Sequence, residues 1–351
     1  MALTLPDLPP FDIAAQSAAL SRYDNLLKPR GSLGQLEALG GQLAGIVGHA
    51  HPKIEHPHLV LMAADHGHAA EGVSAAPSAV TALMVTAFLR GDAAVSVLAR
   101  QQATPFTVVD IGVASPLPAA VTTHPAFRDR RVAPGSANIA EQPALTRAET
   151  ETAIQIGLDS VQAEIAAGAD VVLLGEMGIG NSTAAAAITA VLCERAVRDV
   201  TGYGSGIDPP THQRKVALIE TALAHWQPNR HDPLDVLAKV GGLEIAGLVG
   251  VALGAAAARR PVLLDGFITG AAALIAARLD PALSPYLIAA HQSAEPGHAA
   301  VLSALALVPL LRLNMRLGEG TGALLALPLL RAACATLNEM ATLSDAGITL
   351  P

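Results

Sequence analysis

The feature that most constrains the fold is a short, continuous apolar run that recurs along the chain. Each run ends in a turn of glycine or polar residues and is followed by an alanine-rich stretch of helical character. Strands buried on both faces are continuous apolar runs, whereas half-exposed strands alternate. Strand, turn and helix repeated in this order predict a parallel sheet with helices on both faces, a doubly wound α/β fold. The predicted strands are 58–65, 106–111, 170–175, 261–265 and 286–290.

The two ends of the chain differ from this pattern, because no strand is predicted before residue 58 or after residue 321. Helices are predicted over 13–27, 34–49, 78–90, 146–167, 182–198, 212–226, 243–258, 269–279, 297–311 and 322–340. We therefore expect a nucleotide-binding α/β domain over 58–321, and a small helical domain formed by 1–57 and 322–351. The proline-rich connection 112–145 is predicted to be irregular.

Composition excludes several classes of protein. Hydrophobic residues make up 51% of the chain and charged residues 15%, which excludes disorder. The longest uncharged run, 72–89, contains a glycine, a proline and hydroxyl side chains, and the N-terminus has no signal-peptide pattern, so we expect a soluble, cytoplasmic protein with no membrane span. Aromatics are 3% and the net charge is −8, without basic patches, so we expect no nucleic-acid partner. Cys193 and Cys334 are predicted to be buried free thiols.

The turn after the third predicted strand, GEMGIGNST (175–183), is glycine-rich and leads directly into a helix. Glycines let backbone N–H groups approach a ligand closely, and a helix N-terminus favours an anion. Asn181, Ser182 and Thr183 are good helix caps that can also donate to phosphate oxygens. No Gly-Lys-Ser/Thr follows, so this is not a Walker A loop. The turn indicates a phosphate and ribose site, with Glu176 suited to a ribose hydroxyl; an ordinary strand–helix turn is the alternative.

A second glycine cluster, LGEGTG (317–322), precedes the last predicted helix and surrounds one carboxylate, Glu319. An acidic residue at a helix start complements the helix dipole, which is the purely structural interpretation. That role does not require three glycines in five positions. We therefore expect Glu319 to have a catalytic role.

Four residues of metal-ligand type follow the first predicted strand, namely Asp65, His66, His68 and Glu71. Metal hydrolases place Asp and His at strand ends, so a zinc or manganese site in the His-rich region 49–68 is an alternative. His58, however, begins the strand that His66 follows, so the two histidines are predicted to lie at its opposite ends. We expect the upstream histidines to be solvated and no metal to bind.

Three further polar residues are candidates for a role in binding or in holding a turn. Ser293, in the turn HQSAEPGH (291–298), is a candidate donor to a phosphate. Lys215 is one of few lysines, although a lone lysine on a helix is usually solvated. Asp265, at the end of the fourth predicted strand, is interpreted as a structural hydrogen-bonding residue rather than a substrate contact.

Together these motifs resemble those of the nicotinate-nucleotide–dimethylbenzimidazole phosphoribosyltransferase family, which serves the lower-ligand branch of cobalamin synthesis. The matching segments occur in order across nearly the whole chain. They are KPRGSLGQLE (28–37), ADHGHAAEGVS (64–74), DIGV (110–113), GEMGIGNSTAAAA (175–187), TGYGSGID (201–208), LLDGFITGAAAL (263–274), HQSAEPGH (291–298) and LGEGTGA (317–323).

The resemblance implies transfer of the 5-phosphoribosyl group from nicotinate mononucleotide to 5,6-dimethylbenzimidazole, giving α-ribazole 5′-phosphate and nicotinate. It also implies a Rossmann-like large domain, a small helical domain from both chain ends, a homodimer and no cofactor. Glu319 carries over as the catalytic base. The residues implied to bind phosphate and ribose are Glu176, Gly178, Ile179, Gly180, Asn181, Lys215, Ser293, Gly318 and Gly320. Those implied to form the base pocket are Ser74, Pro77, Leu83, Met84 and Leu317.

The chemistry of this reaction agrees with the residues. Nicotinate leaves with its pyridine nitrogen neutralised, so no general acid is needed for its departure. No pyrophosphate is released, so no Mg²⁺-binding Asp pair is required. What remains is a phosphate anchor and a base for the azole N–H proton. Glu319 in an apolar pocket, with its pKa raised toward the working pH, can be that base. Attack opposite the leaving group inverts the configuration at C1′.

The sequence departs from the family pattern at Leu83 and Ala87, where members often carry Gln and Asn. The preferred acceptor is therefore open among dimethylbenzimidazole, another benzimidazole, adenine and a phenol. Two other classes of function also stay open at this point. One is a metal-dependent hydrolase built on Asp65, His66 and His68, and the other is a non-catalytic nucleotide- or azole-binding protein.

Overall fold

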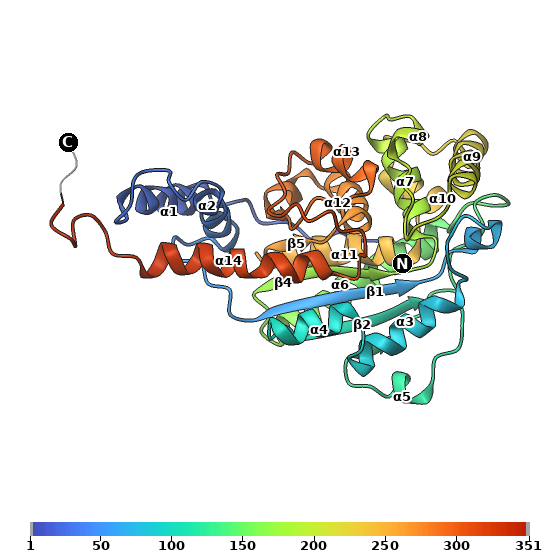
Figure 1. Ribbon diagram of the computed structural model, residues 1–351, viewed down its shortest axis with the longest axis horizontal. Coiled ribbons are helices and arrows are strands. Elements are labelled where there is room, and N and C mark those ends of the chain that lie inside the picture. The colour runs from blue at the N-terminus through green and yellow to red at the C-terminus, as the bar shows by residue number, and fades with distance from the viewer. Residues whose placement is uncertain (1–2, 349–351) are drawn as a thin grey trace.

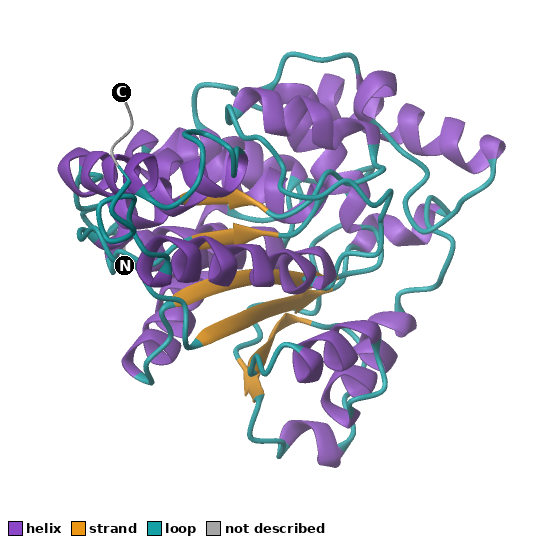
Figure 2. Ribbon diagram, turned by 60° about the vertical axis from the view of Figure 1, so that its left-hand side comes forward, coloured by secondary structure: helices purple, strands orange, loops and turns teal. Residues whose placement is uncertain are grey.

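Within residues 3–348, which the computed structural model describes, six parallel strands form one sheet in the order β3-β2-β1-β4-β5-β6. The chain starts in the middle of the sheet at β1, builds outward to one edge and then returns to build the other half. Figure 2 shows the strands edge to edge, with helices on both sides. The predicted Rossmann-like α/β fold is confirmed. The strands are β1 (Pro57–Ala64), β2 (Phe106–Gly112), β3 (Phe127–Asp129), β4 (Val171–Met177), β5 (Val262–Leu264) and β6 (Leu287–Ala289).

The helices correspond mostly to the predicted ones, each starting or ending within a few residues of the expected position. The α-helices are α1 (Ile13–Asn25), α2 (Gln35–Val47), α3 (Ala79–Arg90), α4 (Ala94–Gln101), α5 (Ala119–Thr122), α6 (Arg147–Ala166), α7 (Asn181–Leu192), α8 (Val197–Val200), α9 (Pro209–Trp226), α10 (Pro233–Val240), α11 (Leu243–Ala257), α12 (Phe267–Leu279), α13 (Pro296–Ala304) and α14 (Thr321–Glu339). The short 3-10 helices are η1 (Gly67–Glu71) and η2 (Pro281–Tyr286).

Some of these elements correct the predictions. The connection 112–145 is not irregular throughout, because it contains α5 and the edge strand β3. The predicted helix 182–198 divides into α7 and α8, with Glu194 between them in the left-handed region at a φ of 52°. The predicted helix 297–311 ends at Ala304, shortly before Ala306 at a φ of 54°. Helices α4 and α10 were not predicted.

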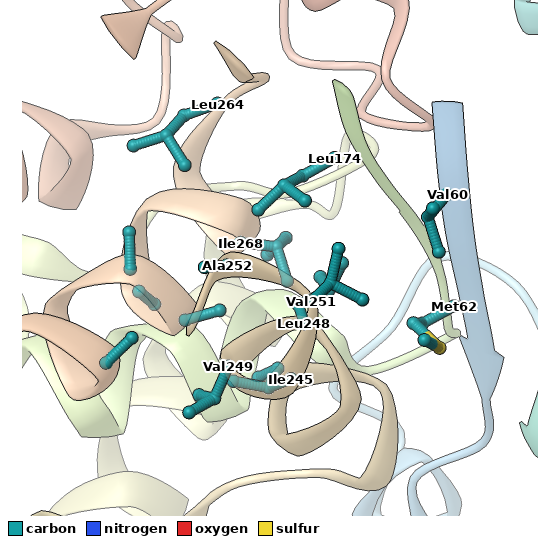
Figure 3. Packing of buried hydrophobic residues seen from close by; sticks show 14 of the residues in the cluster. Val60, Met62, Leu174, Ile245, Leu248, Val249, Val251, Ala252, Leu264 and Ile268 are labelled. Carbon is teal, nitrogen blue, oxygen red and sulfur yellow. The ribbon is translucent and has the colours of Figure 1, made fainter. Parts of the chain in front are cut away.

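Helix α11 forms the centre of the core. All of its residues except Ala257 are buried, and it packs against β1, β4, α6 and α12. Figure 3 shows Leu248 and Val251 of this helix on the side of Leu174 of β4 and of Val60 and Met62 of β1. Its approach to α6 is so close that a Cβ atom at Gly157 would lie 2.9 Å from the backbone nitrogen of Val251. The small residues of this sequence therefore allow helices to pack backbone against backbone.

The two ends of the chain lie together beside the sheet, where α1 and α2 contact the C-terminal part of α14 (Figure 1). A small separate core joins them, made of Ala19, Tyr23, Leu26, Ala44 and Leu337. The Tyr23 hydroxyl donates to the carbonyl oxygen of Ala333 at 2.7 Å. Helix α14 also packs on β4 and α4, so it bridges this helical cluster and the sheet. Of the expected helical domain, residues 1–2 and 349–351 lie outside the described residues.

Two helical stretches are long and apolar enough to cross a membrane by length and composition, namely 79–101 and Thr321–Glu339. The first consists of two helices, α3 and α4, that are separated at Gly91 with a φ of 86°. The second, α14, buries much of its surface against β4, α4 and α2. The apolar residues of α14 therefore contribute to packing inside the protein.

Candidate active site

A cavity of about 310 Å³ lies beyond the carboxyl ends of β4, β5 and β6. Its lining comes from the turns after β1, β4, β5 and β6, from the segment 203–207, and from the turn before α14. In open parallel sheets the carboxyl ends of the strands meet at one edge, and ligands bind in the crevice outside it. The fold therefore places the glycine-rich turns 178–180 and 318–320 in one site.

The first of these turns joins β4 to α7 and packs against His66 and His68. A Cβ atom at Gly178 would collide with the carbonyl oxygen of Ala64, and one at Gly180 would lie 3.1 Å from His68 Nε2. Gly180 has a φ of 101°, in the left-handed region that favours glycine. His68 is fully buried, which lowers its pKa to about 3, so its neutral ring can donate to the Gly180 carbonyl oxygen at 3.0 Å. Both glycines are thus required by close contacts.

Two buried carboxylates, Glu176 and Glu319, line this cavity. Oε1 of Glu176 accepts from the backbone N–H of Glu319 at 3.4 Å, and its Oε2 accepts from the side-chain amide of Asn181. Burial raises the pKa of Glu176 to about 8, with further contributions from the charges of Asp265 and Glu244. Glu176 is therefore mostly protonated at neutral pH, and its carboxyl can then donate to a ligand hydroxyl as well as accept from one.

The Glu319 carboxylate has the properties of a base that works near neutral pH. Burial raises its pKa to about 7; the backbone amide of Val95 opposes the shift and the charge of Asp265 adds to it. Its Oε2 atom is buried and has no hydrogen-bond partner among residues 3–348. An unpartnered carboxylate oxygen beside a cavity can accept a proton from a bound ligand.

Another part of the cavity lining carries positive charge. Lys215 is only 1% exposed, and its Nζ donates to Ser182 Oγ at 2.9 Å and to the carbonyl oxygen of Gly202 at 3.5 Å. Burial lowers the pKa of Lys215 to about 8, while the nearby charge of Glu295 raises it. Arg316, which also lines the cavity, donates to the carbonyl oxygen of Gly204 at 3.1 Å. A lysine, an arginine and the N-terminus of α7 together form a site suited to an anion.

A third part of the lining is apolar and includes Val73, Val80, Met84 and Leu317. Val80 and Met84 are four residues apart on α3 and therefore face the same side of that helix. Such a wall suits a flat, uncharged ring. The site thus combines an anion-binding region, a pair of carboxylates and an apolar wall within one cavity.

Comparison with known proteins identifies the family. A family model described as "Phosphoribosyltransferase" matches residues 8–348. Proteins named nicotinate-nucleotide–dimethylbenzimidazole phosphoribosyltransferase from Roseiflexus sp. (strain RS-1) and Chloroflexus aggregans are 52% and 53% identical, over 99% of this chain and 97% of each relative. The crystal structure of the protein of that name from Thermus thermophilus matches with a TM-score of 0.91 at 43% identity, over 97% of this chain and 100% of that chain. The chain belongs to the nicotinate-nucleotide–dimethylbenzimidazole phosphoribosyltransferase family. It is a phosphoribosyltransferase, an enzyme of the pentosyltransferase kind.

This one cavity is lined by most of the residues that we expected, from the sequence, in a phosphoribosyltransferase site. They are Ser74, Met84, Glu176, Gly178, Ile179, Gly180, Asn181, Lys215, Ser293, Leu317, Gly318 and Glu319. Ser293 is held by its own turn, since its backbone N–H donates to His298 Nδ1 at 2.9 Å. Residues that line the cavity without having been proposed include Tyr203, Glu295 and Arg316.

Three of the proposed residues lie outside the lining of this cavity. Leu83 is 65% exposed, because the helical period that turns Val80 and Met84 toward the cavity turns Leu83 away. Pro77 lines a second, neighbouring cavity of about 260 Å³. Gly320 lies behind the lining, where a Cβ atom would come within 2.7 Å of Leu59 Cδ1. Ala87 is also absent from the lining, so neither departure from the family pattern lies in the wall.

The side chains that suggested a metal centre have other partners in this phosphoribosyltransferase. His66 Nε2 lies 2.7 Å from Glu244 Oε1, and Asp65 Oδ2 accepts from the backbone N–H of Ala114 at 2.8 Å. Glu71 accepts from the side chain of Asn138. In the part of the chain that the structure describes, no three His, Cys, Asp or Glu side chains are grouped to hold a metal ion.

Proposed function

We propose that this enzyme transfers the 5-phosphoribosyl group of nicotinate mononucleotide to 5,6-dimethylbenzimidazole, giving α-ribazole 5′-phosphate and nicotinate for cobalamin synthesis. The observation that carries the proposal is the Glu319 carboxyl group. Burial raises its pKa to about 7, and its Oε2 atom has no hydrogen-bond partner among the described residues. Glu319 lines the same cavity as Lys215 of the anion site. The names of its relatives, at about half identity over the whole chain, support the same substrates.

In the proposed mechanism, the nucleotide phosphate binds at Lys215, Ser182 and the N-terminus of α7, and Glu176 hydrogen-bonds the ribose. The acceptor base lies against the apolar wall of Met84 and Leu317. The bond between C1′ and the pyridinium nitrogen breaks, and its electron pair neutralises that nitrogen. The azole nitrogen attacks C1′ from the opposite face, which inverts the configuration, and the azole N–H proton goes to Glu319.

The proposal is tested by incubating the protein, in the presence of a chelator, with nicotinate mononucleotide and a panel of dimethylbenzimidazole, benzimidazole, adenine and a phenol. Mass spectrometry identifies the ribotides, and NMR of the purified product identifies the α anomer. We expect α-ribazole phosphate and an equal amount of nicotinate. No nicotinate release with any acceptor would contradict the transferase function, and the β anomer would contradict inversion.

Replacing Lys215 with Met is expected to raise the KM for nicotinate mononucleotide by about 10- to 100-fold. The change keeps the length and apolar bulk of the side chain but removes a charged hydrogen bond worth about 1.5–3 kcal/mol. Lys239→Met is the matched control, because Lys239 forms an ion pair with Asp235 on α10, outside the cavity lining. Equal KM values for the two variants would contradict the anchoring role.

The lowered pKa of Lys215 also predicts how nucleotide binding depends on pH. Burial lowers its pKa to about 8, so the ammonium form that attracts phosphate is lost as the pH rises through that value. We expect kcat/KM for nicotinate mononucleotide, which reports the free enzyme, to fall above about pH 8. Lys215→Met should lack this alkaline limb. A limb that persists unchanged in the variant would assign it to another group.

The remaining features that the family implies are part of the same proposal. We propose that residues 58–321 form the nucleotide-binding domain, and that 1–57 with 322–351 form the small helical domain. The enzyme acts as a cytoplasmic homodimer without a cofactor. Light scattering of the purified protein measures the oligomeric state, and a monomeric mass would contradict the dimer.

A further inference from the structure

Asp265 connects the end of β5 to the start of α14. It is 1% exposed, and its carboxylate accepts three backbone N–H groups from a segment more than 50 residues away. Oδ2 accepts from Gly320 at 3.1 Å, and Oδ1 accepts from Gly322 at 2.6 Å and from Ala323 at 3.2 Å. Helix α14 has glycine at its N-cap and no side-chain cap of its own. Asp265 therefore caps this helix from another strand.

The capped segment contains an unusual backbone conformation. Gly318, Glu319 and Gly320 have φ values of 84°, 65° and 89°, so three successive residues are left-handed. Glycine adopts this region readily, but for a residue such as Glu it costs about 1–3 kcal/mol and persists only where neighbouring structure fixes it. The carboxylate of Asp265 bonds the amides directly after Glu319 and can supply that restraint.

The surroundings keep the Asp265 carboxylate in place. His291 Nε2 lies 3.7 Å from Oδ1, and a Cβ atom at Gly322 would collide with the His291 ring. Among the titratable groups packed around this turn, Glu176 contacts the backbone N–H of Glu319. The charge that acts on Glu319 is that of Asp265, and His291 is the group next to the Asp265 carboxylate.

A comparison within the fold shows what is particular to Asp265. Asp110, at the end of β2, is also buried and accepts from the backbone N–H groups of Gly112 and Val113 at 3.1 and 2.8 Å. Those amides belong to its own turn, and its Oδ2 accepts from Arg131 Nη2 at 3.0 Å, so none of these partners of Asp110 belongs to the turn of Glu319. The amides that Asp265 bonds belong to the turn of the proposed catalytic base, and Asp265 itself lines the cavity.

We propose that Asp265 is the positioning residue of Glu319, holding the left-handed turn that aims this carboxylate at the acceptor base. The inference rests on the proposed role of Glu319 as the base. It assigns Asp265 a part in the reaction that the sequence alone treated as structural. Asp265 acts through the backbone of residues 320–323.

The test compares Asp265→Asn with the matched control Asp110→Asn. A displacement of about 1 Å at a reacting group costs about 10²-fold in rate, so we expect Asp265→Asn to lower kcat by about that factor with the KM for nicotinate mononucleotide within about twofold. Burial raises the pKa of Asp265 to about 7, so Asp265 and Glu319 titrate in the same range, and the charge of Asp265 raises the pKa of Glu319; without that charge the acid limb of the kcat profile should move to lower pH. Asp265→Glu, which restores the charge, should return the limb toward its original pH. Asp110→Asn should lose stability with an unchanged profile.

Hydrogen exchange provides a readout that does not depend on the reaction. The amides of Gly320, Gly322 and Ala323 should exchange as slowly as those of β5 in the wild-type protein, and faster in Asp265→Asn. Fast exchange in the wild type overturns the proposal even if the variant does not fold. An active wild type whose kcat and pH profile are unchanged in Asp265→Asn also overturns it. If the wild-type protein has no transferase activity but these amides are protected, the proposed function is refuted. The structural part of the inference, that Asp265 holds the turn of residues 318–320, is then still supported.

Discussion

Replacing Glu319 with Gln is expected to lower kcat by about 10²- to 10⁴-fold, the usual contribution of a general base. Gln retains the size and shape of Glu and leaves the backbone of the turn intact. It cannot accept the azole proton, so attack on C1′ must proceed from a protonated azole or with water as the base. The KM for nicotinate mononucleotide should change little, because the phosphate site at Lys215 is formed by other elements. Initial rates at saturating concentrations of both substrates measure the effect.

The pH profile makes this prediction specific. Burial raises the pKa of Glu319 to about 7, so the carboxylate that accepts the proton is lost as the pH falls through that value. The wild-type kcat should therefore fall below about pH 7, and the residual rate of Glu319→Gln should lack that limb. Glu339→Gln, at the exposed far end of the same helix, is the control and should behave like the wild type. Full activity of Glu319→Gln would show that another group removes the proton.

The strands were predictable from the sequence because burial on both faces leaves a continuous apolar run. The exception, β3, shows the limit of this signal. Only Phe127 of its three residues is buried, while Arg128 and Asp129 are exposed at the edge of the sheet. An edge strand of this length has no apolar run, and its pairing with β2 depends on the tertiary structure.

The glycine-rich turns of the site were also predictable, because their glycines serve a local purpose. Gly180 and Gly318 have left-handed backbones. Such positions favour glycine regardless of distant contacts, and the chemistry of the turn is visible in its neighbours Glu176 and Glu319. The glycine pattern alone is therefore enough to locate both carboxylates in the sequence.

The contacts and orientations that the sequence did not show depend on packing between distant segments. Asp265 meets the start of α14 across more than 50 residues, and no sequence spacing encodes that contact. The family resemblance implied a place for Leu83 in the base pocket, whereas in the structure Met84 lines the cavity and Leu83 is exposed. Helical phase becomes known only once the helix is packed on the sheet.

The second large effect concerns stability, at the crossing of α6 and α11. Gly157 of α6 faces Gly247 and Val251, and Gly250 of α11 faces the backbone of Ile154 in return. Helix propensity alone predicts that Gly157→Ala stabilises the protein by about 1 kcal/mol, since glycine is unfavourable in a helix interior. Packing predicts the opposite sign, because the added Cβ would collide with the carbonyl oxygen of Gly247 and neither backbone can move without displacing the core.

Packing should dominate, and we expect Gly157→Ala to lower the free energy of unfolding by about 3 kcal/mol, at the upper end of the usual cost of overpacking. Because the contact is between two backbones, no change of rotamer can relieve it, whereas a clash with a flexible side chain often relaxes. Urea denaturation followed by circular dichroism measures the change. Ala163→Ser adds one heavy atom to the exposed face of the same helix and should stay within about 0.5 kcal/mol of the wild type. A higher midpoint for Gly157→Ala would mean that the two helices are farther apart than the structure shows, and that the abundance of small residues does not serve their close approach.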